Sequence, residues 1–134
     1  MEFQGSFDAG ARLALTISAR RAGLLGKNTV GTEHLLLGLA ARRSTPAGRL
    51  LAQAGVGSWR SLYYTARLTG SGFPVRHPER VSKNLHSVLR QAAQSAGRGQ
   101  VGDGHLLCAL LGCRDCTARR VMEKMDADIP ALER

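Results

Sequence analysis

The chain has 134 residues and a formal net charge of +9, with 43% hydrophobic and 4% aromatic residues. This length is typical of one domain that buries its own core, and the composition argues against a disordered chain. No apolar run approaches the roughly 20 residues of a membrane span, and the N-terminus lacks the pattern of a signal peptide, so we expect a cytoplasmic protein.

The first predicted element is a long amphipathic helix at residues 7–25. Apolar residues at helical spacing are expected to form its buried face: Leu13, Leu15, Ile17, Ala22 and Leu24. Gly26 follows directly and is expected to end the helix, because glycine readily takes the left-handed conformation of a helix C-terminus. A short loop then leads to Gly31.

The second helix begins in the phrase "GTEHLLLGLA" (31–40), where Thr32 is the predicted N-cap. Ser44 or Thr45 is expected to cap a third, short helix that runs to Ala54, with a proline in its first turn and a stop at Gly55. A fourth helix spans about Ser58 to Thr69 and is expected to bring three residues toward the core: Trp59, Leu62 and Tyr63.

The stretch "GSGFPVRHP" (70–78) is rich in glycine and proline and is predicted to be a connector. The order of elements then repeats. Residues 78–96 are predicted to form a second long helix, with Pro78 in its first turn and Gly97 as its stop. Asp103 is the predicted N-cap of "GDGHLLCALL" (102–111), and the ending "IPALER" leaves room for a truncated last helix. The apolar face of the helix at 78–96 is expected at Val81, Leu85, Val88, Leu89, Ala92 and Ala93.

The two phrases align with a constant offset of 71 residues, which places Gly31 over Gly102 and His34 over His105. We therefore predict an all-α fold, built as a tandem pseudo-two-fold repeat of two four-helix units. Residues 1–134 are expected to form one domain, with repeat one at 7–69, a linker at 70–77 and repeat two at 78–134.

This pattern resembles the N-terminal domain of the Clp unfoldases, also called the Clp repeat domain, and is most similar to the ClpC type. The resemblance runs from Phe7 to about Asp128, with "GTEHLLLGLA" as a highly specific match and "GDGHLLCALL" as a degenerate one. It implies a domain ahead of two AAA+ ATPase modules that receives substrates or adaptors, which the ATPase ring unfolds into the ClpP protease.

The sequence contains no G-x-x-x-x-G-K-[S/T] loop for nucleotide phosphates, so we expect a binding module without enzymatic activity and without a cofactor. The resemblance implies that its partners are Clp substrates, adaptor proteins or peptides, including phosphoarginine-bearing or cyclic peptides. It also implies a link to the Clp ATPase and protease, and a monomeric state. Because the sequence contains no ATPase module, we hypothesise a stand-alone protein that modulates the Clp protease by capturing ligands that the full unfoldase would otherwise bind. Arg76 and His77 depart from the family pattern, which leaves the ligand specificity between the repeats open.

In ClpC-type domains the glutamate of the T-E-H motif is implicated in recognising phosphorylated arginine, and by that resemblance the residue here is Glu33. A carboxylate can accept paired hydrogen bonds from a guanidinium, and a helix N-terminus can receive the phosphate. Thr32 and Asp103 complete the candidate ligand-binding residues. Gly104 stands at the glutamate position in repeat two, so we predict one retained pocket and one weakened pocket. The structural alternative is that Glu33 only stabilises the first turn of its helix.

Histidines and cysteines raise two further hypotheses. His34 and His105 could suggest catalysis, but we expect each to tie its helix to the neighbouring loop, because no nucleophile with an orienting acid stands out. A set of four residues is chemically adequate for zinc: His105, Cys108, Cys113 and Cys116. We expect no metal and reduced thiols instead, with Cys108 facing the core as Leu37 does, and with Cys113 and Cys116 exposed and redox-sensitive.

Two other interpretations stay open from the sequence. The chain could be the excised N-domain of a longer Clp ATPase, or a basic protein associated with nucleic acid. The second interpretation rests on arginine pairs without interleaved aromatic residues, a pattern that favours a solvated basic face over a nucleic-acid site. These pairs are Arg20 and Arg21, Arg42 and Arg43, and Arg119 and Arg120.

Overall fold

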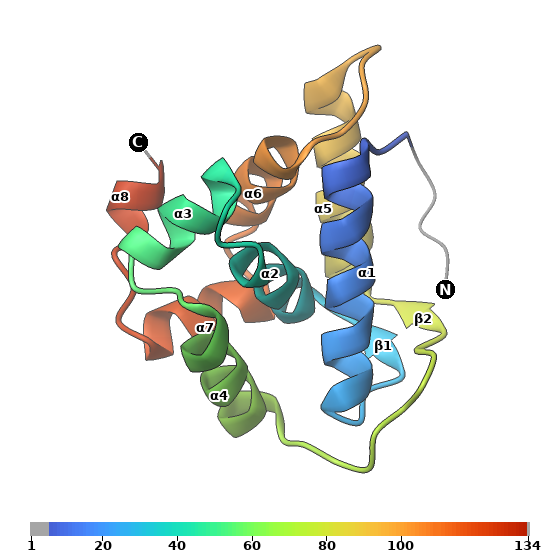
Figure 1. Ribbon diagram of the computed structural model, residues 1–134, viewed down its shortest axis with the longest axis vertical. Helices are drawn as coiled ribbons and strands as arrows, with labels where there is room; N and C mark the ends of the chain where they lie inside the picture. The colour runs from blue at the N-terminus through green and yellow to red at the C-terminus, as the bar shows by residue number, and fades with distance from the viewer. Residues whose placement is uncertain (1–5, 134) are drawn as a thin grey trace.

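The computed structural model describes residues 6–133, which form eight helices and one pair of two-residue strands (Figure 1). Helices account for almost all of this regular structure, so the all-α prediction is confirmed. None of the helices in the described range is long and apolar enough to cross a membrane. In chain order the elements are α1 (Ala9–Leu24), β1 (Thr29–Val30), α2 (Thr32–Ala41), α3 (Pro46–Gln53), α4 (Ser58–Thr69), β2 (Arg80–Val81), α5 (Lys83–Ala96), α6 (Asp103–Gly112), α7 (Thr117–Lys124) and α8 (Ile129–Glu133).

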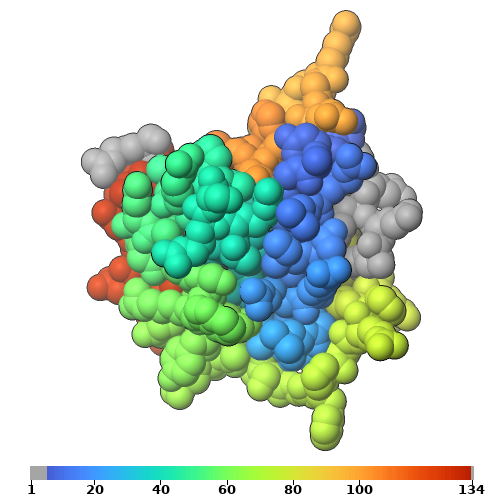
Figure 2. All heavy atoms as spheres, viewed as in Figure 1, coloured from blue at the N-terminus to red at the C-terminus, as the bar shows by residue number. Residues whose placement is uncertain are grey.

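Helix α2 lies in the middle of the molecule, between α1 and the group formed by α3, α4 and α7 (Figure 1). Its leucines at 35, 36, 37 and 39 are each at most 2% exposed. Side chains from both halves join the same hydrophobic core, including Leu106 and Leu110 of α6. Figure 2 shows a closely filled surface, from which the loop after α5 and the connector after α4 protrude.

The two halves interlock through short parallel backbone pairings. Val30, just before α2, pairs with Val81, just before α5. In the reciprocal position, Val101 precedes α6 and forms a bridge with Phe7, which precedes α1. Each half therefore ties the entry of its second helix to the entry of the other half's long helix. The predicted limits of the domain (1–134) and of the two repeats stay predictions, and residues 1–5 and 134 lie outside the described range.

Local signals placed most helix ends correctly. Gly26, Gly55 and Gly97 follow α1, α3 and α5 with φ of +79°, +92° and +61°, the left-handed region that glycine tolerates best. The Thr45 hydroxyl accepts a hydrogen bond from the backbone N–H of Gly48 at 3.0 Å, which confirms this residue as a cap. Helix α4 begins and ends at the predicted residues, and α8 is as short as expected.

Pro78 does not start a helix, and that prediction is wrong. Helix α5 begins at Lys83, with the Ser82 hydroxyl as its cap at 3.1 Å from the N–H of Leu85. The residues between are held by β1 and the residue before it: the N–H groups of Glu79 and Arg80 donate to the carbonyl of Asn28, and the N–H of Ser82 donates to the carbonyl of Val30. Strand pairing with a distant segment therefore replaces the first turn that the proline suggested.

The predicted buried faces of α1, α4 and α5 are partly wrong. Leu13 and Leu24 are 46% and 52% exposed, whereas Ala14 and Ser18 of α1 are buried against α2. A Cβ at Gly38 of α2 would collide with the Ser18 hydroxyl and the Ala14 carbonyl, so the two helices approach too closely for large side chains. Small residues consequently face α2 here, and Leu13 and Leu24 lie outside, whereas Leu15 is buried as predicted. Ala93 of α5 is likewise exposed.

The inward face of α4 is formed by Ser61 and Thr65, both 0% exposed. Trp59 and Tyr63, which we expected toward the core, are 78% and 56% exposed. Because α4 packs on α2 and α7 through small side chains, its aromatic residues are left on the outer surface.

Candidate functional site

A pocket of about 630 Å³ opens at the N-terminus of α2, and we call it the α2 pocket. Both halves of the chain contribute to it: the loop before β1 and the start of α2 from one half, and the first residues of α5 and α7 from the other. The lining residues are Gly26, Lys27, Asn28, Thr29, Gly31, Thr32, Glu33, His34, Thr69, Ser82, Lys83, Asn84 and Thr117.

Glu33 lies in the first turn of α2 and is half-buried in this pocket. Its carboxylate lies over Gly31, where an added Cβ would collide with Glu33 Oε1. Burial raises the pKa of Glu33, while a hydrogen bond with its own backbone and the charge of Lys27 lower it. The Glu33 carboxylate is thus partly desolvated, and it lines the pocket, where a ligand can contact it.

Two ammonium groups border the same pocket. Lys27 is partly buried, and its Nζ donates to the carbonyl of Thr69 at 2.8 Å, which fixes the side chain between α1 and the end of α4. Lys83 is exposed at the start of α5. The helix N-terminus adds partial positive charge. The pocket therefore presents one negative group beside several positive ones, an arrangement suited to a ligand that carries both signs.

Thr32 and Asp103 are not N-caps, and that prediction is wrong for both. The caps are Gly31 and Gly102, whose extended backbone precedes the first helical residue. The reason is a histidine three residues later in each repeat. His34 Nδ1 accepts the N–H of Gly31 at 2.9 Å, and His105 Nδ1 accepts the N–H of Gly102 at 2.9 Å. These bonds confirm that each histidine ties its helix to the preceding loop.

His34 is a neutral structural residue. It is 2% exposed, and burial together with the positive charge of Lys27 lowers its pKa to about 4. Since Nδ1 is the acceptor for the N–H of Gly31, the ring carries its proton on Nε2. The hydrogen bond from the preceding backbone N–H to the imidazole Nδ1 is present in both repeats and explains why the histidine recurs.

Thr32 has a role that its position in the sequence does not reveal. Its side chain is 2% exposed, and its hydroxyl accepts the backbone N–H of Ala118 at 3.2 Å. Cys116, the N-cap of α7, makes no side-chain capping bond. Thr32 therefore caps a helix that lies 86 residues further along the chain.

Asp103 does not line the α2 pocket. Its Oδ2 forms a 3.0 Å ion pair with Arg42 Nη1, which also donates to the carbonyl of Gly10 at 2.9 Å. Burial raises the pKa of Asp103, the charge of Arg42 lowers it, and the nearby Asp8 raises it. At Gly104, the counterpart of Glu33, an added Cβ would meet no atom within 4 Å, and no carboxylate is present. A ligand-binding role for Asp103 in repeat two stays a prediction.

The cysteines differ from the expected pattern. Cys108 is exposed, although its counterpart Leu37 is buried, because α2 is covered on more sides than α6. Cys116 is buried and donates its thiol to the carbonyl of Cys113 at 2.8 Å, so its predicted exposure is wrong. Burial raises the pKa of Cys113 to about 11, which keeps this thiol protonated and poorly reactive near neutral pH. Within residues 6–133, no three His, Cys, Asp or Glu side chains are grouped to hold a metal ion.

Two of the three arginine pairs are partly engaged in ion pairs within the chain. Arg42 is engaged by Asp103, and Arg119 Nη2 lies 3.3 Å from Glu133 Oε1. Their sequence neighbours Arg43 and Arg120 are exposed. Two of the three pairs thus contribute one arginine to intramolecular contacts.

Comparison with known proteins places the chain in a family. No protein-family model matches it. The protein "Negative regulator of genetic competence ClpC/MecB" of Bacillus subtilis (strain 168) is 28% identical over 128 residues, which cover 93% of this chain and 16% of that protein. "Chaperone protein ClpC2, chloroplastic" of Arabidopsis thaliana is 32% identical over 127 residues, which cover 91% of this chain and 13% of that protein. The chain thus spans about a seventh of the length of the curated relatives that it matches.

Solved structures agree on the fold. The N-terminal domain of the chaperone ClpD from Arabidopsis thaliana superposes with a TM-score of 0.80 at 24% identity, covering 96% of this chain and 92% of that one. The Hsp104 N-terminal domain from Candida albicans superposes with a TM-score of 0.71 at 16% identity, covering 96% and 87%. With sequence relatives along nearly its whole length and the same helical fold, this chain belongs to the family of Clp N-terminal domains.

Proposed function

We propose that this chain is a receptor domain that captures protein substrates or adaptors for a Clp-type unfoldase, and that the α2 pocket binds a phosphorylated arginine side chain. The observation that carries the proposal is that Glu33, Lys27 and Lys83 line one pocket at the N-terminus of α2, where the charge of Lys27 acts on the Glu33 carboxylate. The relatives in the Clp family support the broader part of the proposal.

The chemistry of phosphoarginine fits this arrangement. Its guanidinium group keeps N–H donors, which the Glu33 carboxylate can accept in a paired geometry. Its phosphoryl group needs cations and N–H donors, which the two lysines and the first turn of α2 supply. The hydroxyl of Thr32 is held by Ala118, so Thr32 would contribute its backbone and the pocket wall.

The test is a calorimetric titration of a phosphoarginine peptide and its unphosphorylated counterpart into the wild type and Glu33→Gln. We expect one site per chain, selective for the phosphorylated peptide. Loss of a charged hydrogen-bond acceptor should weaken binding about ten- to a hundredfold. Glu123→Gln is the matched control, because this exposed glutamate lies near the far end of α7. Two equivalent sites, or equal affinity of wild type and Glu33→Gln, would contradict the proposal.

The proposed cellular role is to present captured proteins to a Clp ATPase and thereby to modulate proteolysis. This role requires only that the chain bind its partners, and no catalytic activity of the chain itself. Tagged chain incubated with cell extract should recover a Clp component, an adaptor or a client, and less of it after Glu33→Gln. The cytoplasmic location, the monomeric state and the binding of cyclic peptides stay predictions.

A further inference from the structure

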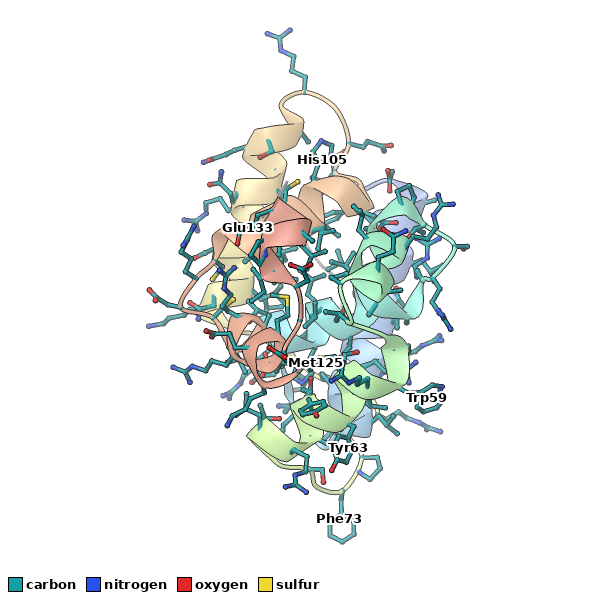
Figure 3. The ribbon with its side chains drawn as sticks, turned by 90° about the vertical axis from the view of Figure 1, so that its left-hand side faces the viewer. Trp59, Tyr63, Phe73, His105, Met125 and Glu133 are labelled. Carbon is teal, nitrogen blue, oxygen red and sulfur yellow. The ribbon has the colours of Figure 1, made fainter. Side chains whose placement is uncertain are left out.

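The outer face of α4 is an aromatic and basic surface. Its residues form two rows at a spacing of four, Trp59–Tyr63–Arg67 and Arg60–Tyr64–Leu68, so both rows follow one side of the helix. We call these six residues the α4 patch. Figure 3 shows Trp59 projecting from the edge of the molecule, with Tyr63 further along α4. Trp59 and Tyr63 are exposed beside arginines. Trp, Tyr and Arg are the residue types that most often dominate the binding energy at protein interfaces.

The patch carries positive charge, and none of its six residues is acidic. Helix α4 contains no aspartate or glutamate, and none of the ion pairs among the described residues includes Arg60 or Arg67. Lys124 of α7 adds a third cation beside the patch. A groove of about 430 Å³ lies between these elements, lined by Tyr63, Tyr64, Arg67, Leu68 and Lys124.

The arginines are oriented by neighbouring groups. Arg60 donates to the carbonyls of Gly55 and Met125 at 3.2 and 3.0 Å, and its guanidinium lies 5.5 Å from the ring centre of Tyr64. The guanidinium of Arg67 lies 5.8 Å from the ring centre of Tyr63. Cation–π contacts of this kind hold the side chains in place and leave their charge available to a partner.

We propose that the α4 patch is a docking site for an acidic segment of a partner protein, one that carries apolar side chains among its carboxylates. Carboxylates of that segment would pair with Arg67 and Lys124 at the groove. Its apolar side chains would cover Trp59 and Leu68, which are 78% and 38% exposed. The complementary charge would also speed association with a chain of net charge +9.

Two other occupants fit the patch less well. Single-stranded nucleic acid binds through bases stacked on open aromatic faces. Here Arg67 covers a face of Tyr63, Arg60 covers a face of Tyr64, and the two tyrosine rings pack edge to face at 5.4 Å. A second copy of this chain in a symmetric contact through the patch would place the cations of both copies in one interface without acidic partners from the patch, with unfavourable repulsion.

The α4 patch is separate from the α2 pocket, which includes Thr69 of α4 but none of the six patch residues. The proposal therefore does not depend on phosphoarginine binding. Trp59 is the single tryptophan of the chain, so its fluorescence reports directly on the patch.

The experiment titrates the full chain with a synthetic amphipathic peptide that has glutamates on one helical face and leucines on the other. We expect a saturable change in Trp59 emission. Arg67→Glu should weaken this binding on the order of tenfold, as expected for reversal of an interface charge. Arg90→Glu, at an exposed position of α5, is the matched control and should leave the affinity of the peptide within about twofold of wild type.

Further probes separate the competing explanations. The same peptide with lysine in place of glutamate should not bind, and oligothymidylate should compete weakly with the acidic peptide. Absence of any change in Trp59 emission with the acidic peptide would overturn the proposal. Equal losses in Arg67→Glu and Arg90→Glu, tighter binding of oligothymidylate, or concentration-dependent dimerisation that buries Trp59 would overturn it as well. Circular dichroism of both variants confirms that they fold.

Discussion

At the scale of single residues, Glu33 combines two opposing requirements. Its carboxylate must be ionised to accept hydrogen bonds from a guanidinium, yet burial disfavours the ionised form and raises the pKa. A hydrogen bond with the backbone of Glu33 and the charge of Lys27 act in the other direction and favour the ionised carboxylate. The proposed affinity of the α2 pocket therefore depends on the balance between burial of Glu33 and these two favourable interactions.

The raised pKa predicts opposite pH effects on binding and on folding. As pH falls through the raised pKa, Glu33 takes up a proton and its contribution to phosphoarginine binding is lost, at a higher pH than for an ordinary glutamate. For folding the sign is reversed: the native state holds this proton more tightly than the unfolded state, so protonation of Glu33 favours the native state. NMR titration of the Glu33 carboxyl carbon measures its midpoint directly.

Lys27→Met tests the same balance. Removing the ammonium should raise the midpoint of Glu33 further, whereas Lys124→Met, remote from the pocket, should leave it unchanged. A midpoint at or below the ordinary value in wild type would show that burial does not dominate. In Glu33→Gln, the loss of phosphoarginine binding that accompanies protonation of Glu33 in the wild type should no longer be seen.

At the scale of helices, signals local in the sequence predicted the elements well. Thr45 with its following proline gave the start of α3, and Gly26 and Gly97 gave the ends of α1 and α5. Buried faces were less predictable, because they depend on which helix lies opposite. The helical spacing of Leu13 predicts a core residue, but Leu13 is exposed. The face of α1 that packs on α2 carries small side chains instead, because the two helices approach closely at Gly38.

The candidate site was only partly predictable for the same reason. The motif drew attention to Glu33 through resemblance, and the structure places it in a pocket. Lys83 was not a candidate, because its approach to the pocket depends on the pairing of β1 with β2. The hydrogen bond from the N–H of Ala118 to the hydroxyl of Thr32 joins residues 86 apart in the sequence, so no local sequence pattern indicates it.

That long-range cap makes a stability prediction for α7. Thr32→Val keeps the side-chain volume but removes the hydroxyl that accepts the N–H of Ala118. The free energy of unfolding should fall by about 1 kcal/mol, the usual worth of an N-cap. Thr32→Ser keeps the acceptor and should retain the cap, although it loses a buried methyl group. Hydrogen exchange should show faster exchange at Ala118 in Thr32→Val than in Thr32→Ser; equal rates would contradict the capping role.

At the scale of the whole molecule, the two halves form one structure. Val30 pairs with Val81 and Phe7 with Val101, so the segments that begin the main helices cross between the halves. The α2 pocket and the shared core draw on both halves as well. We therefore expect the two repeats to unfold together in one cooperative transition.

The ion pair between Arg42 and Asp103 joins the halves through partly buried charges, with side chains 22% and 15% exposed. The raised pKa of Asp103 indicates that the cost of burial exceeds the attraction of Arg42. Removing one partner would leave the other charge partly buried and unpaired, so Asp103→Leu or Arg42→Met alone should lower the free energy of unfolding by about 1–3 kcal/mol.

The double substitution Arg42→Met with Asp103→Leu should recover most of that loss, because an apolar pair needs no compensating charge. Chemical denaturation of the four proteins gives the coupling energy, with an unchanged denaturant slope as the sign that both halves still unfold together. Additive losses in the double variant would mean that the two side chains do not act as a pair. A second transition in either single variant would mean that this contact, rather than the backbone pairings and the common core, makes the two repeats fold as a unit.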